Sequence, residues 1–201
     1  IIHATASINR IMDLESLPRE EIDEPVLLEG TAGIRVSDVT FAYPDSSANV
    51  LDGFSHDFRP GSRTAIVGPT GVGKSTLIRL LLSLLKPQSG SIDVYNNIGI
   101  APVSPATRCN LVYVPQGNTI FSGTIADNLR LIKQDATDEE IIEALKIACA
   151  WDFVQQFPEG LHHPLGAGGR GISEGQAQRL AIARALLRKA PVLLLDEATS
   201  G

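Results

Sequence analysis

Apolar and polar residues follow two different patterns along the chain, and the change between them divides the expected fold. They alternate over 34–41, which predicts a strand with one buried face, and a second strand is predicted over 51–58, after the turn at 44–49. These strands indicate a small antiparallel β layer. Residues 64–67 instead form a short apolar run of the kind that is buried on both faces of a parallel sheet. The sequence therefore predicts an α/β fold.

Helices and further buried strands follow this run. A glycine-rich loop leads into an apolar helix expected over 77–85, and another helix is expected over 176–189. Between them, Thr137 and Glu140 have the spacing of a capping box, which predicts that a helix begins there. Additional strands are predicted over 91–95, 111–114 and 192–195.

Composition excludes several classes of protein. With 201 residues, of which 43% are hydrophobic, the chain can bury one substantial core. The net charge of -6 gives no support for a nucleic-acid groove or a polybasic membrane contact. No apolar run approaches the roughly 20 residues that cross a bilayer. Cys109 and Cys149 lack the spacing of zinc ligands, and we expect two reduced thiols.

The loop before the first helix matches the phosphate-binding pattern GxxxxGK[ST] and lies between a predicted strand and a predicted helix. Its glycines let backbone N–H groups turn onto phosphates, at the positive end of the helix. Lys74 supplies a charge for the β- and γ-phosphates, and the Ser75 hydroxyl is placed to bind Mg²⁺. Alone, the motif predicts only a nucleotide binder. Its residues are Gly68, Pro69, Thr70, Gly71, Val72, Gly73, Lys74, Ser75 and Thr76.

Two acids follow the apolar strand at 192–195. Asp196 stands at the carboxyl end of a buried strand, where α/β sheets place ligand-contacting groups, and it can hold Mg²⁺ through water. Glu197 can accept a proton from a water that attacks the γ-phosphate. A solvated turn would also carry such acids, but the phosphate loop upstream favours the catalytic interpretation.

The segment 171–185, GISEGQAQRLAIARA, narrows the class of ATPase. It resembles the signature of the ATP-binding cassettes of ABC transporters, usually LSGGQ followed by a helix rich in Arg and Ala. In that family the signature of one cassette closes over ATP held by the phosphate loop of another. The resemblance implies that Ser173, Gly175 and Gln176 contact this ATP. Two positions depart from the commonest residues, Ile172 and Glu174.

Other segments carry the same resemblance. Val114-Pro115-Gln116 is similar to the family's Q-loop, which implies that Gln116 contacts Mg²⁺ and the attacking water. Phe41-Ala42-Tyr43-Pro44 occupies the place of its A-loop, which implies that Tyr43 stacks on adenine. A tyrosine packed at the end of the β layer is the alternative. The run 119–129 resembles exporter-type cassettes in particular.

The resemblance covers nearly the whole chain and implies its organisation. Residues 1–30 would be the end of a membrane-domain helix and a linker, with a helical face over 6–17, and residues 31–201 would be the cassette. Its expected parts are an antiparallel β layer (31–63), a nucleotide-binding core (64–136), a helical subdomain with the signature (137–190) and the Walker B strand (191–201).

Two departures from the family accompany these motifs. The run 166–169 lacks the Gly-Glu pair that exporters usually carry in the loop that touches the membrane domains. The chain also ends where the family's D-loop begins, so we expect a C-terminally truncated cassette. The strand with the family's switch histidine would be missing, which would leave 64–67 and 192–195 without a shared neighbour.

We therefore expect an α/β P-loop NTPase of the ABC type that hydrolyses ATP with Mg²⁺. The expected catalytic residues are Glu197, Gln116 and Lys74, and Ser75, Gln116 and Asp196 would hold the metal. The expected partners are a second cassette, identical or not, and transmembrane domains, without nucleic acid. The parent would be a transporter at the cytoplasmic face of a cell membrane, the fragment itself being soluble and impaired in turnover.

Two other interpretations stay open. A soluble ABC ATPase of the DNA-repair or chromosome-structure type would need a nucleic-acid surface or a coiled-coil insertion, and the acidic charge and the absence of sustained heptads disfavour both. A module that dimerises on binding ATP, without turnover, would not need Glu197.

Overall fold

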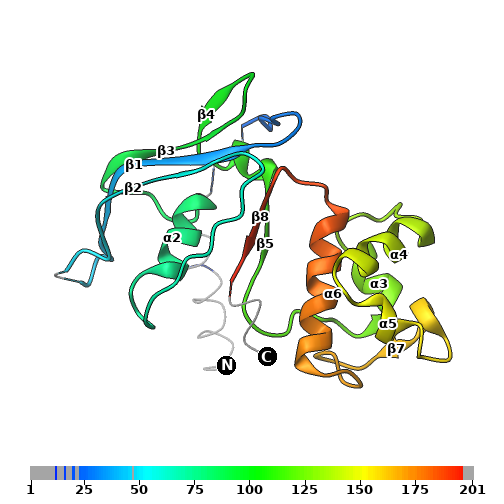
Figure 1. The fold of residues 1–201 in the computed structure, drawn as a ribbon. Helices are drawn as coiled ribbons and strands as arrows, with labels where there is room; N and C mark the ends of the chain where they lie inside the picture. Colours follow the sequence, from blue (N-terminus) through cyan, green and yellow to red (C-terminus); the bar gives the residue numbers. More distant parts are fainter. Residues whose placement is uncertain (1–11, 13–15, 17–19, 21–22, 47, 197–201) are drawn as a thin grey trace.

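The computed structural model describes residues 12, 16, 20, 23–46 and 48–196, and it arranges them around a central pair of strands (Figure 1). The strands are β1 (Gly33–Phe41), β2 (Leu51–Phe58), β3 (Ser89–Tyr95), β4 (Ile100–Pro102), β5 (Leu111–Val114), β6 (Gly123–Thr124), β7 (Pro164–Leu165) and β8 (Val192–Leu195). The α-helices are α2 (Lys74–Leu81), α3 (Ile125–Arg130), α4 (Asp138–Ile147), α5 (Trp151–Val154) and α6 (Glu174–Leu187), with 3₁₀ turns η1 (Ala106–Asn110) and η2 (Gly160–His162). The helical face expected over 6–17 lies almost wholly outside the described residues.

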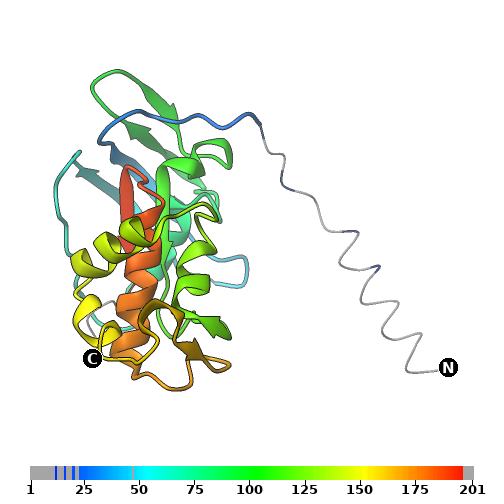
Figure 2. The same cartoon turned by 90° about the vertical axis from the view of Figure 1, so that its right-hand side faces the viewer.

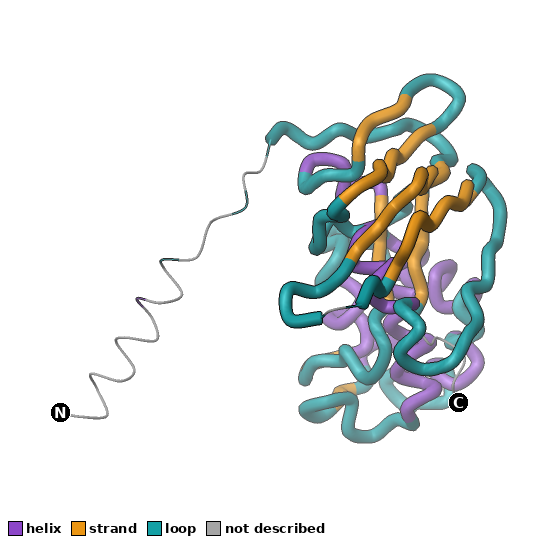
Figure 3. The backbone as a smooth tube through the Cα atoms, turned by 90° about the vertical axis from the view of Figure 1, so that its left-hand side faces the viewer, coloured by secondary structure: helices purple, strands orange, loops and turns teal. Residues whose placement is uncertain are grey.

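The antiparallel sheet has the strand order β2-β1-β3-β4, and Figure 3 views the molecule from the side of this sheet. The strands predicted over 34–41 and 51–58 form an inner strand and one edge of this sheet. The sheet also contains β3 and β4, which follow α2 in the sequence and are joined by the turn after Tyr95. It therefore includes residues beyond the layer expected over 31–63. In β1 a bulge at Asp38, whose φ is 52°, shifts the register and keeps both Val36 and Val39 buried.

The bulge requires a glycine on the neighbouring strand. Gly90 of β3 has φ 84°, and a Cβ built there would lie 2.4 Å from the backbone oxygen of Asp38. Only a residue without a side chain can bring the two strands this close.

The central pair consists of β5 and β8, which run parallel with Val114 opposite Leu195. Both strands have the bounds predicted from the sequence. Leu111 and Tyr113 pack toward the core that α2 shares with the antiparallel sheet, whereas Val112 and Val114 pack against α6. The pair thus separates two cores and connects the phosphate-loop helix to the signature helix.

The helices α3 to α6 enclose a third core, and Figure 2 shows this helical group in front of the sheets. Capping boxes begin three of these helices, with Thr124, Thr137 and Ser173 at the N-cap. The box predicted at Thr137 and Glu140 is therefore confirmed, and α4 starts where expected. No helix in the described part of the chain has the length and apolar character needed to cross a bilayer.

The strand predicted over 64–67 is wrong. These residues have no strand structure, and Val67 is 87% exposed and Ile66 42% exposed. The physical reason is that no strand among the described residues pairs with this segment, so its backbone groups have no ladder to join. Among the described residues, β8 pairs only with β5.

A buried asparagine holds the segment before β1 against η1. The fully buried side chain of Asn110 accepts a hydrogen bond from the Leu28 amide (2.7 Å) and donates to the carbonyl oxygens of Val26 (2.7 Å) and Thr107 (2.9 Å). One amide side chain therefore fixes two residues of the incoming chain to the end of η1.

We predict that Asn110→Ala lowers the free energy of unfolding by about 2–3 kcal/mol, because it leaves partners of these bonds unsatisfied. Urea denaturation followed by circular dichroism measures the change. Asn96→Ala is a matched control: Asn96 also bonds three backbone groups, at Glu29, Ile98 and Gly99, but it lies in a half-buried turn where water can replace them. Equal losses for the two variants would contradict the interpretation.

Candidate functional site

The phosphate loop leads into α2, which begins at Lys74. Its ammonium donates to the carbonyl oxygens of Gly68 (2.7 Å) and Pro69 (2.9 Å), so the lysine lies across its own loop. The helix has no side-chain cap at Gly73, which leaves the first amides of α2 to an incoming anion. Lysine charge and helix amides together form an exposed site suited to phosphate.

Gly73 is required by both conformation and space. Its φ is 101°, and a Cβ there would lie 2.8 Å from Cγ1 of Val50 and 3.3 Å from the backbone oxygen of Val50. The loop can therefore approach the start of β2 only with glycine at this position. The remaining residues named for phosphate binding, from Gly68 to Thr76, lie in this loop and the first turn of α2.

The first acid after β8 lies beside this loop. The Ser75 hydroxyl donates to Oδ2 of Asp196 (3.3 Å), and the backbone amide of Asp196 extends the ladder by bonding the Val114 oxygen (3.0 Å). Two residues far apart in sequence, both named as metal ligands, thus meet at the start of α2. Glu197 lies outside the described residues.

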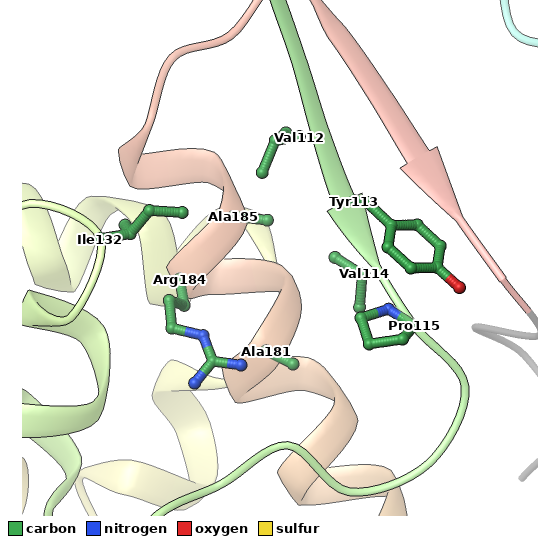
Figure 4. Close-up of a pocket in the computed structure, with 8 residues that line it drawn as sticks. All are labelled: Val112, Tyr113, Val114, Pro115, Ile132, Ala181, Arg184 and Ala185. Atoms are coloured by element: carbon green, nitrogen blue, oxygen red, sulfur yellow. The ribbon is translucent and has the colours of Figure 1, made fainter. Parts of the chain in front are cut away.

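Tyr113 is a residue of this site that the sequence analysis missed. Its hydroxyl donates to the same Oδ2 of Asp196 (3.2 Å), and burial, followed by the charge of Asp196, raises the pKa of Tyr113. In Figure 4 its ring leaves β5 on the face opposite Val112 and Val114. The alternation of β5 was the signal that could have found it, because it places Tyr113 on the same face as Leu111. This face packs against α2.

Gln116 follows the end of β5 and is exposed. Because the carboxyl ends of parallel strands meet at one edge of a sheet, Gln116 and Asp196 leave β5 and β8 on the same side. The structure is therefore compatible with a shared role at a metal, which stays a prediction.

Tyr43 lies against α2. Its hydroxyl is 3.3 Å from Oγ1 of Thr76 and accepts a hydrogen bond from Arg79 (3.0 Å), and the contacts with Thr76 and then Arg79 lower the pKa of Tyr43. Its ring meets Phe41 edge-on at 5.1 Å between centroids. This packing matches the structural alternative for Tyr43, and stacking on adenine stays a prediction.

The signature residues form the third capping box. Oγ of Ser173 accepts from the Gln176 amide (3.2 Å), while Oε1 of Gln176 accepts from the Ser173 amide (2.8 Å). Ser173 is thus the N-cap of α6, and Gly175 and Gln176 lie in the first turn of this helix, which belongs to the helical group. Within this chain the signature lies at the start of α6, whereas the phosphate loop leads into α2, and contact of the signature with ATP stays a prediction.

A cavity of about 40 Å³ lies between β5 and α6, lined by Val112, Val114 and Arg184 among others (Figure 4). Such a volume holds about one water molecule, so it is no nucleotide site. Nucleotide phosphates fit the exposed loop at α2 instead.

The donor set at α2 suits Mg²⁺. This ion takes oxygen ligands, keeps several waters and is usually held by one or two carboxylates together with substrate phosphates. Ser75 and Asp196 offer a hydroxyl and a carboxylate at one place. Within the described ranges no group of three or more His, Cys, Asp and Glu residues could hold another metal.

Comparisons with known proteins show the family of this chain. The model of the ABC transporter family matches residues 51–200. An ABC transporter ATP-binding protein of Mycoplasma pneumoniae is 45% identical over 192 residues, which cover 95% of this chain and 30% of the relative. An ATP-dependent lipid A-core flippase of Neisseria meningitidis is 41% identical, covering 88% of this chain and 28% of the flippase.

A solved structure of a bacterial Atm1-family ABC exporter with ATP bound has a TM-score of 0.81 and 33% identity, covering all of this chain and 35% of that one. The fold class and the exporter resemblance expected from the motifs are thereby confirmed. The chain spans about a third of the length of these relatives.

We predict that Tyr113→Phe weakens the loss of stability at alkaline pH. The pKa of Tyr113 in the folded protein lies above its ordinary value of about 10, so the stability it confers is complete below that value and is lost as the pH rises through the folded-state pKa. Without the phenol, the contribution of Tyr113 to the alkaline loss of stability disappears. Urea denaturation between about pH 9 and 11 measures the slope.

Asp196→Asn is the matched variant, because it keeps the phenol but removes the charge that helps to raise the pKa of Tyr113. It should also give a shallower slope. Slopes equal to the wild type in both variants would refute the contact between Tyr113 and Asp196.

Proposed function

Because this chain belongs to the ABC transporter family, whose model matches residues 51–200, we propose that it is the ATP-binding and ATP-hydrolysing cassette of an exporter-type transporter. Cassettes of this family are generally ATPases. The contact between Ser75 and Asp196 carries the proposal, since it unites the phosphate loop and the acid-bearing strand end at one helix start.

Binding of the triphosphate would rest on the loop from Gly68 to Thr76. Lys74 would exchange its bonds to loop carbonyls for bonds to the β- and γ-phosphates, and the uncapped amides of α2 would hold the same oxygens. Tyr43, which lies half-buried beside α2, would present its ring to adenine. Positioning and charge would thus dominate binding.

Ser75, Asp196 and Gln116 would hold Mg²⁺, which supplies charge stabilisation for the transferred phosphoryl group. Tyr113 would orient the Asp196 carboxylate through its hydrogen bond. Glu197 would accept the proton of the attacking water, and Gln116, whose amide both donates and accepts, would orient that water.

A second cassette, identical or not, would complete the site by presenting its Ser173, Gly175 and Gln176 to the γ-phosphate. Transmembrane domains would use the resulting closure to move a substrate, with the cassette on the cytoplasmic face of the membrane. The relatives support this: one is named an ATP-dependent flippase and another an ABC exporter. Nucleic acid is no expected partner, given the net charge of -6.

We predict that Lys74→Ala weakens ATP binding about 10- to 100-fold, because a charge-assisted contact is lost. Glu197→Gln should keep binding and abolish turnover, because it removes only the proton acceptor. Titration with a fluorescent ATP analogue measures binding. The rate of phosphate release by the complete protein measures turnover. Turnover retained in Glu197→Gln would favour a different base.

The chain alone should bind nucleotide weakly and turn over little, since residues 64–67, which lead into the phosphate loop, are held by no strand among the described residues. Full turnover by the purified monomer would refute this. Tight binding without any turnover in the complete protein would instead support the ATP-gated dimerisation module.

We predict that Ser173→Ala abolishes ATP-dependent association of two cassettes, whereas Thr137→Ala leaves it intact. Each residue is the N-cap of a capping box, Thr137 on α4 and Ser173 on α6, so each variant should lose about 1 kcal/mol of stability. Only Ser173 would also contact nucleotide. Sedimentation velocity with ATP in a Glu197→Gln background measures association. Equal loss of association in both variants would reduce Ser173 to a helix cap.

A further inference from the structure

The segment after Gln116 is tied to the helix that carries the signature. Arg184 of α6 donates from Nη1 to the backbone oxygen of Thr119 (3.0 Å) and from Nη2 to its hydroxyl oxygen (2.6 Å). Figure 4 shows this side chain extending from α6. The planar guanidinium thus holds both the main chain and the side chain of one loop residue.

A second tie leads to the loop before the signature. Nδ2 of Asn118 donates to the backbone oxygen of Gly168 (2.7 Å), while its Oδ1 accepts from the Ile120 amide (2.9 Å). Gly169 makes room for this side chain, since a Cβ there would lie 2.7 Å from Nδ2 of Asn118. The amide of Asn118 therefore shapes its own loop and fastens it to the next one.

The same segment is also anchored to α3. Asn128, which is 2% exposed, accepts from the Phe121 amide (2.8 Å) and donates to the Phe121 oxygen (3.0 Å). Residues 118–121 are thus bonded to α3, α6 and the 166–169 loop, all of which belong to the helical group.

Arg184 is engaged with no carboxylate in the part of the chain that the structure describes, and burial lowers its pKa. A half-buried charge without an ion pair depends on its hydrogen bonds, so the contacts with Thr119 stabilise Arg184 as well as the loop. Each partner therefore restrains the other.

We infer that Arg184 and Asn118 are positioning residues that clamp the segment after Gln116 to the signature-bearing helical group, so that Gln116 and Ser173 move together. This inference rests on the proposed function for the roles of Gln116 and Ser173. A shift of α6 on closure over ATP would then be transmitted to the residue proposed to orient the attacking water.

Hydrogen exchange on the chain without nucleotide tests the clamp. The Ile120 and Phe121 amides are bonded to side chains and report opening of the segment. Arg184→Lys and Thr119→Val should speed their exchange about tenfold. Asn118→Asp, which keeps the acceptor for Ile120 but loses the donor to Gly168, should act likewise. Thr119→Ser, which keeps the hydroxyl, and Arg188→Lys, an exposed position near the end of α6, should match the wild type.

Exchange unchanged in Arg184→Lys and Asn118→Asp, or raised equally throughout the chain, would overturn the clamp. The second readout is the ratio of ATP affinity with Mg²⁺ to that without it, which Arg184→Lys should lower about tenfold without changing the affinity in the absence of Mg²⁺. An unchanged ratio would disconnect the clamp from Gln116. If the complete protein bound no ATP, the proposed function would fail, while the exchange data would still decide the clamp.

Discussion

The parallel pairing of β5 with β8 is the constraint on which the site depends. Its register sets Val114 against Leu195, and the next amide, that of Asp196, still bonds the Val114 oxygen. This places the carboxylate where Ser75 and Tyr113 can both reach it. The opposite face of β5 packs on the small residues Ala181 and Ala185, so the same ladder also fixes the position of α6. A slip of β8 by one residue would turn its side chains to the other face of the pair and move Asp196 away from Ser75 and Tyr113.

The sequence was most informative where the determining contacts are local. The start of the helix capped by Thr137 was predicted from the capping box, because the two hydrogen bonds of the box join residues three apart. The strands at 111–114 and 192–195 were predicted correctly because an apolar run bounded by turn residues is sufficient for a buried strand. The family motifs identify both Ser75 and Asp196, which meet in the structure.

The errors and omissions come from contacts between distant residues. The run 64–67 has the composition of a buried strand, but composition cannot supply the neighbour to which a strand must bond, and Val67 is exposed. Tyr113 was seen only as a strand residue, since its role depends on Asp196, 83 positions away. The recruitment of β3 and β4 into the antiparallel sheet was missed for the same reason: the approach of Gly90 to Asp38 is invisible in either segment alone.

The position of the Asn118 side chain explains why the run 166–169 contains glycine at position 169. Exporters usually carry an acidic residue in this loop, whereas here Gly169, with φ 71°, leaves the space that the Asn118 amide occupies. The loop is therefore bonded within the cassette through the oxygen of Gly168. The run 166–169 carries no side-chain charge and exposes only backbone groups and the methyl group of Ala167 for contact. Asn118 and Thr119 are bonded to this loop and to α6. A displacement of the loop would therefore be transmitted to the segment after Gln116 through direct hydrogen bonds.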